Sequence, residues 1–218
     1  MLTRHCRLKF AAVLVTLLGS PLSWALTPFS EDFEGLTAAD PLALTNTGWL
    51  AFGNVFEAGG AYRFGYGAFP APNGGQAFSA LVTDQGGPNQ GGVQLSVFND
   101  YNCCLFFPDN VGHFNGTDRV ESNVYQEQPI EAADAGQTWV FTFDAKRGLI
   151  SGNTTAAAFI KTLDPNAGFA LTNFLSLDTT SVSTSWEEGK QISIFIDPGL
   201  VGQRLQIGFI NTASDFEG

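Results

Sequence analysis

The sequence has few basic residues and almost no histidine, and each shortage argues against a class of function. Ten Lys and Arg residues stand against 21 Asp and Glu residues, which gives a net charge of −11. Nucleic acids and anionic membranes bind proteins through basic surfaces, so this balance argues against both as partners. Of the two histidines, only His113 lies beyond the first 25 residues, which excludes a metal site built on two histidines there.

The chain also lacks an apolar run long enough to cross a membrane. The longest run, FAAVLVTLLG, has ten residues, whereas a spanning helix needs about 20. It follows the basic stretch MLTRHCRLK and precedes SPLSWA, with small residues at Ser23 and Ala25. This order predicts a signal peptide over residues 1–25 and export to the periplasm or the extracellular space. Cleavage would remove three basic residues and no acid, so the remaining net charge of −14 favours neutral ligands.

Cysteine is scarce, and its placement is unusual. Beyond residue 25 only the adjacent pair Cys103 and Cys104 remains, so a framework of separated disulfides is excluded. Two free thiols, a disulfide between the two neighbours and a bond to another chain all remain open. An oxidising compartment favours the disulfide between Cys103 and Cys104.

Strand patterns dominate the rest of the sequence. Alternating apolar residues bounded by Gly, Pro, Asn and Asp predict strands over residues 77–83, 92–98, 120–130, 138–145, 156–163, 191–197 and 204–210. The best helical pattern is a turn at residues 38–44. These features predict one all-β domain over residues 26–218, a jelly-roll β-sandwich of two antiparallel sheets. The stretches 59–75 and 99–118 are expected to be long loops, unusually rich in aromatic residues.

Several stretches resemble the carbohydrate-binding modules of the family 4/9 type, which are jelly-roll sandwiches of the galactose-binding-like group. FSEDFEG (29–35) is similar to that family's opening strand, and Trp49 follows in TGWLAFGNV. The later strands of that family are similar to three further stretches, IEAADAGQTWVFTFDAK, SVSTSWEEGKQISIFI and RLQIGFINTASDFEG. The resemblance implies a closing strand that this sequence does not include. It also implies a structural calcium ion near the opening strand, with Glu34 as a ligand.

The acidic start of the domain gives the candidate metal ligands, Asp32 and Glu34. In a strand these two carboxylates would lie on one face, while Phe29, Glu31 and Phe33 would lie on the other. Calcium prefers such oxygen ligands. A solvated acidic strand end is the simpler alternative, and nearby Glu31 would need pairing if buried.

Aromatic residues in or beside the predicted loops are the candidate glycan contacts, because sugar rings pack on Trp and Tyr faces. The candidates are Trp49, Tyr62, Tyr66, Tyr101 and Trp186, whereas Trp139 is expected in the core. We therefore predict a non-catalytic protein that binds a neutral glycan. The alternatives are an extracellular structural or adhesion protein and, with less support, a glycan hydrolase or lyase, since no catalytic motif accompanies the abundant carboxylates.

Overall fold

The computed structural model describes residues 25–75, 77–99, 118–150, 152 and 154–214. Ten strands form in the described residues, with one short helix, α1 (Ala43–Asn46). The strands are β1 (Leu50–Phe56), β2 (Tyr62–Pro70), β3 (Ala77–Thr83), β4 (Val93–Asn99), β5 (Arg119–Pro129), β6 (Thr138–Ala145), β7 (Thr155–Asp164), β8 (Ala170–Asp178), β9 (Glu187–Phe195) and β10 (Arg204–Ser214). Short 3-10 turns cover Ala132–Asp134, Pro165–Ala167 and Pro198–Leu200.

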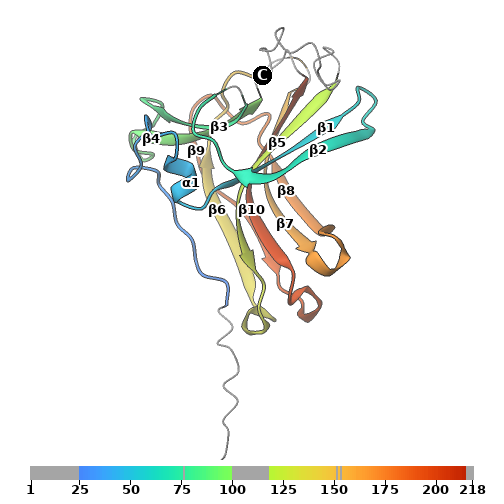
Figure 1. Ribbon diagram of the computed structural model, residues 1–218. Helices are drawn as coiled ribbons and strands as arrows, with labels where there is room; N and C mark the ends of the chain where they lie inside the picture. The colour runs from blue at the N-terminus through green and yellow to red at the C-terminus, as the bar shows by residue number, and fades with distance from the viewer. Residues whose placement is uncertain (1–24, 76, 100–117, 151, 153, 215–218) are drawn as a thin grey trace, which may run out of the picture.

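The strands form two layers (Figure 1). One layer is a six-stranded antiparallel sheet in the order β2-β1-β5-β10-β7-β8. The other consists of two separate antiparallel pairs, β3-β4 and β6-β9. The predicted all-β antiparallel sandwich is thus confirmed, although ladder hydrogen bonds divide its second layer into two pairs.

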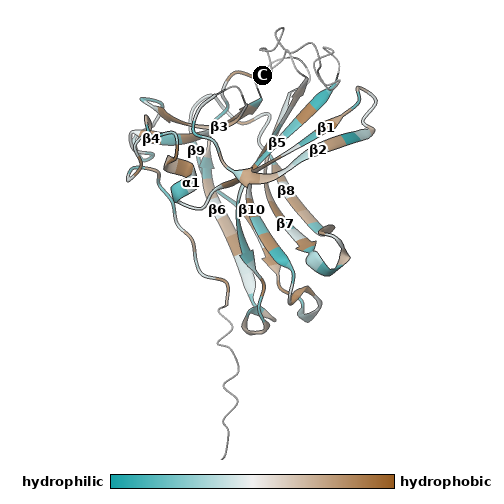
Figure 2. Ribbon diagram, viewed as in Figure 1, coloured by the Kyte–Doolittle hydropathy of each residue, from teal (hydrophilic) through white to brown (hydrophobic). Residues whose placement is uncertain are grey.

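Two hydrophobic clusters hold the layers together, and they share one residue of β10. The first joins β6 and β9 to β7 and β10, with Phe143, Ile160 and Ile194 among its members. The second joins β3 and β4 to β1 and β5. Phe209 packs against both clusters, so both strand pairs cover the same face of the six-stranded sheet. Figure 2 shows apolar and polar residues alternating along the part of β10 that packs against these clusters.

The opposite face of the six-stranded sheet carries a smaller cluster around Tyr125, Phe159 and Ile210. Gly208 lies between Tyr125 and Phe159 in the ladder. A Cβ atom at Gly208 would lie 2.1 Å from the Val124 carbonyl oxygen, so the close approach of the two strands requires glycine. Burial raises the pKa of Tyr125 to about 12, and the nearby Glu127 carboxylate adds to the effect.

Lys161 is a half-buried cation on this face. Its ammonium lies 4.4 Å from the ring centre of Phe159 and 5.2 Å from that of Phe174, and it donates a hydrogen bond to Asn123 Oδ1. Burial lowers the pKa of Lys161 from 10.5 to about 8, and the attraction of Glu121 opposes this effect in part. Lys161 is therefore a cation that the fold accommodates at a cost.

Two of the predicted local structures are wrong. Residues 31–35 form a turn instead of an opening strand: Phe33 has a φ of 63°, and Leu36 N donates to its carbonyl. The side chains of Glu31 and Asp32 accept hydrogen bonds from backbone N–H groups two residues ahead, which competes with strand pairing. The second error is the predicted loop at 59–75, which contains β2. That strand pairs with β1 through two register shifts, which interrupt its alternation.

Candidate functional site

A cleft of about 1440 Å³ lies between the two strand pairs of the second layer. Consecutive residues of β4 line one wall and consecutive residues of β6 line the other. Leu205, Ile207 and Phe209 of β10 form part of its floor. The cleft therefore exists because β4 and β6, in the residues that the structure describes, do not pair with each other.

All three tryptophans of the described residues line this cleft: Trp49, Trp139 and Trp186. Trp49 is 4% exposed and packs against Phe29 and Phe33, with ring centres 6.0 and 5.8 Å away. The indole N–H groups of Trp49 and Trp139 are buried and have no hydrogen-bond partner within the described part of the chain. Packing closes both donors off from solvent, so they add to the cost of burying these rings.

Glutamine is the most frequent polar residue of the lining, with Gln85, Gln90, Gln94, Gln126 and Gln128 all contributing. Gln94 is 6% exposed, and its amide nitrogen donates to the carbonyls of Gln90 and Gly91. The side-chain oxygens of Gln90 and Gln94 are buried, and no described residue donates to them. Side-chain amides therefore line the cleft, although these two oxygens are themselves closed off from solvent.

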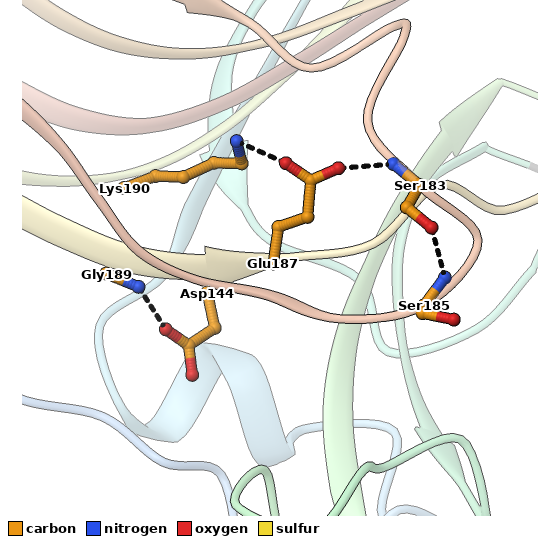
Figure 3. Close-up of polar contacts among 6 residues, drawn as sticks. All are labelled: Asp144, Ser183, Ser185, Glu187, Gly189 and Lys190. Carbon is orange, nitrogen blue, oxygen red and sulfur yellow. Dashed lines mark hydrogen bonds and ion pairs between the residues drawn. The ribbon is translucent and has the colours of Figure 1, made fainter.

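Trp186 is positioned by a loop that polar contacts hold in shape (Figure 3). Glu187 pairs with Lys190 at 2.8 Å and accepts a hydrogen bond from Ser183 N at 2.6 Å. Gly189 N donates to Asp144 Oδ1 at 2.9 Å, which ties the loop to the end of β6. The Lys190 ammonium, with the Ser183 N–H as a second cause, lowers the pKa of Glu187. Glu187 is therefore ionised at neutral pH and keeps these contacts.

The connection between β3 and β4 crosses to this loop at the mouth of the cleft. Gln90 donates to Asp144 Oδ2 at 2.9 Å and to Glu188 at 3.1 Å. The Trp186 indole donates to the Gln85 carbonyl at 3.0 Å, and the Lys146 ammonium lies 5.4 Å from the Trp186 ring centre. Side-chain contacts thus link the two strand pairs where ladder bonds do not.

A segment without regular secondary structure, residues 26–34, lines the cleft and is called here the N-terminal strap. At one end, Thr27 and the Gln128 side chain exchange two hydrogen bonds. At the other end, one oxygen of Glu34 accepts hydrogen bonds from the backbone N–H groups of Gly92 and Val93, each at 2.7 Å. The strap therefore connects β5 to the start of β4 and forms part of the lining.

The predicted site residues separate into three groups. Trp49 and Trp186 both line the cleft. Tyr62 and Tyr66 lie on β2, 61% and 41% exposed, and do not line it. Tyr101, Cys103 and Cys104 lie outside the described residues. Trp139, expected in the core, is half-buried, packs against the first cluster and also lines the cleft.

The predicted metal ligands Asp32 and Glu34 lie in the turn, and each uses one carboxylate oxygen for backbone hydrogen bonds. The second oxygen of each accepts no hydrogen bond from the described residues. No group of three or more His, Cys, Asp or Glu side chains suited to a metal occurs in the described ranges. The two carboxylates would therefore need backbone carbonyls or water to complete a calcium site.

Comparisons with known proteins give no assignment. No protein-family model matches the chain, and no curated protein or solved structure matches it either. Among the described residues, no helix has the length and apolar character needed to cross a bilayer. The functional argument thus rests on the cleft itself.

Proposed function

We propose that this is an exported, non-catalytic carbohydrate-binding protein and that the cleft between β4 and β6 takes a neutral glycan. One observation carries the proposal: Trp49, Trp139 and Trp186 line the same cleft as five glutamine side chains. A glutamine amide, like a sugar hydroxyl, both donates and accepts hydrogen bonds, so the glutamines suit a polyhydroxyl ligand.

The aromatic lining supports the same ligand. Indole faces give sugar C–H groups a large apolar contact, and Trp186 presents its ring on a loop at the mouth. The volume of about 1440 Å³ exceeds the usual range of roughly 300–1,000 Å³ for small-molecule sites. We therefore expect an oligosaccharide instead of a single sugar.

Charge supports a neutral glycan over an acidic one. Glu31, Asp32 and Glu34 of the strap line the cleft, and Asp144 lies at its mouth. None of the ion pairs found in the described residues involves these four carboxylates. Their field would repel sulfated or uronic-acid chains.

The proposal includes a structural calcium ion near the turn at residues 31–34. Asp32 and Glu34 would supply carboxylate oxygens, and the ion would neutralise part of the negative charge of the strap. Its contribution would be to stability, because the turn is a lining element and holds no reacting group.

The test is binding of neutral oligosaccharides of graded length to the wild type and to variants, measured by calorimetry. Trp186→Ala and Trp49→Phe should each weaken binding about tenfold, because each reduces the aromatic surface that lines the cleft. Tyr62→Ala is the matched control, because it removes an exposed aromatic outside the cleft. Equal losses of affinity for Tyr62→Ala and Trp186→Ala would exclude the cleft as the binding site. Release of reducing sugar from the oligosaccharide would show that the protein is a glycan hydrolase instead.

A second candidate, an extracellular structural or adhesion protein, is favoured by edge strand β8. Leu171, Phe174 and Leu175 of this strand are 55%, 47% and 36% exposed, and the strand has no Lys, Arg or Pro. Unprotected apolar edges are places where another chain adds a strand. Light scattering distinguishes this candidate: self-association lost in Leu171→Lys, without any glycan binding, would favour it.

A further inference from the structure

Asp134 is a fully buried carboxylate at the end of the sandwich where β5 leads into β6. It has 0% exposure and belongs to the short 3-10 turn Ala132–Asp134. Its Oδ2 atom accepts a hydrogen bond from Glu131 N at 2.8 Å, which closes the turn. Neighbouring Ile130, Ile196 and Leu26 are core residues of the first cluster.

The carboxylate has no cationic partner among the residues that the structure describes. The ion pairs found there join Arg63 to Asp118, Lys190 to Glu187 and Arg204 to Glu127. A buried carboxylate without a counter-charge is costly, because the protein interior solvates charge far less well than water. The geometry around Asp134 therefore calls for a positive group.

The other hydrogen-bond donor to the Asp134 carboxylate is the backbone N–H group of Leu26. This nitrogen lies 2.9 Å from Oδ1 and 3.1 Å from Oδ2. Leu26 is itself 5% exposed. The next residue, Thr27, exchanges two hydrogen bonds with the Gln128 side chain. Both carboxylate oxygens thus converge on the nitrogen that follows the predicted cleavage point after Ala25.

We propose that cleavage after Ala25 frees the amino group of Leu26 and that its ammonium forms a buried ion pair with Asp134. A signal peptidase and water hydrolyse the Ala25–Leu26 peptide bond. The C–N bond breaks, the water oxygen joins the Ala25 carbonyl carbon to form a carboxylate, and the Leu26 nitrogen takes up both protons of the water to become an ammonium group. The same nitrogen position then carries the charge that Asp134 lacks.

An ammonium suits this geometry better than the amide it replaces. An amide nitrogen has one hydrogen to share between two oxygens, whereas an ammonium has three. Charge-assisted hydrogen bonds are also stronger than neutral ones. Removal of the leader would therefore stabilise the mature fold and anchor the strap that lines the cleft. This inference rests on the proposed export and is independent of the glycan.

The test compares three forms of the protein in thermal melts: a chain starting at Leu26, the same chain acetylated on its amino group, and a chain starting at Ser23. We expect the Leu26 chain to melt about 5 °C above the other two, which should agree with each other. Asp134→Asn should abolish the difference, and the acetylated chain gives the answer even if that variant does not fold.

Two results would overturn the inference. Equal melting temperatures for the free and acetylated Leu26 chains would show that the ammonium adds nothing. An exported protein whose first residue by mass spectrometry is not Leu26 would show that the pair does not form in the mature protein. Loss of glycan binding with an intact melting difference would count against the proposed function alone.

Discussion

The amide nitrogen of Gln90 donates a hydrogen bond to the carboxylate of Asp144, at 2.9 Å, across the mouth of the cleft. Gln90 lies in the connection between β3 and β4, whereas Asp144 lies on β6. We expect the two residues to be coupled by about 1 kcal/mol in the free energy of unfolding.

A double-mutant cycle with Gln90→Ala and Asp144→Ala measures this coupling in chemical denaturation. Tryptophan fluorescence should shift in the Asp144 variant, because Asp144 also accepts a hydrogen bond from Gly189 N close to Trp186. Strictly additive effects of the two substitutions would mean that the link across the mouth does not form in solution.

Glu34 should contribute to stability through the start of β4. Glu34→Ala removes the acceptor of two backbone N–H groups and should cost about 1–2 kcal/mol. Glu34→Gln keeps an oxygen acceptor and should cost less. The midpoints of urea denaturation give both values, and an equal loss would show that the charge of Glu34 matters more than its hydrogen bonds.

Calcium should raise the melting temperature of the wild type, because a bound ligand stabilises the folded state. Asp32→Asn should reduce this rise, since an amide is a weaker calcium ligand than a carboxylate. Melting curves in calcium and in a chelator provide the measurement. An unchanged wild-type melting temperature would remove calcium from the proposal.

Lys161 makes stability depend on pH. Its folded pKa of about 8 lies below the unfolded value of 10.5, so the unfolded chain binds more protons between these values. Wild-type stability relative to Lys161→Met should therefore rise by up to about 3 kcal/mol from pH 8 to pH 10.5. Denaturation at several pH values tests this, and the contribution of Tyr125 cancels because both proteins contain it. A difference that stays flat with pH would show that Lys161 keeps its ordinary pKa.

Gly208→Ala should destabilise the protein by at least about 2 kcal/mol. The new methyl group would meet the Val124 carbonyl and the backbone of Tyr125, which cannot move aside as a flexible side chain can. Gly35→Ala is the control, because a Cβ there has no atom within 4 Å. Chemical denaturation should separate the two variants clearly, and similar losses would contradict the close strand approach.

Alternating sequence patterns predicted the strands that bury one face. The pattern at 138–145 coincides with β6, and those at 191–197 and 204–210 overlap β9 (Glu187–Phe195) and β10 (Arg204–Ser214), because the first hydrophobic cluster buries every second residue there. Alternation did not predict strand β8, because its apolar residues Leu171, Phe174 and Leu175 are exposed and do not alternate with polar ones. The pattern also did not predict the turn at Phe33, because local side-chain hydrogen bonds determine the backbone conformation there.

The candidate site was only partly predictable for a related reason. Trp49 and Trp186 stood out as aromatic residues near loops, but nothing local shows that they share a cleft with Trp139. The glutamines carried no signal at all, since their place in the lining depends on how the two strand pairs pack on the central sheet. Such a property arises from the assembled layers and not from any one stretch of sequence.

Phe209 couples the two strand pairs of the second layer to each other. Its ring lies 5.6 Å from that of Phe141 and 5.5 Å from that of Phe143, while the same side chain packs against the cluster under β3 and β4. Neither strand pair can leave the central sheet without exposing this ring to water. We therefore expect the two pairs to be lost in one cooperative transition on heating, despite the cleft that separates them.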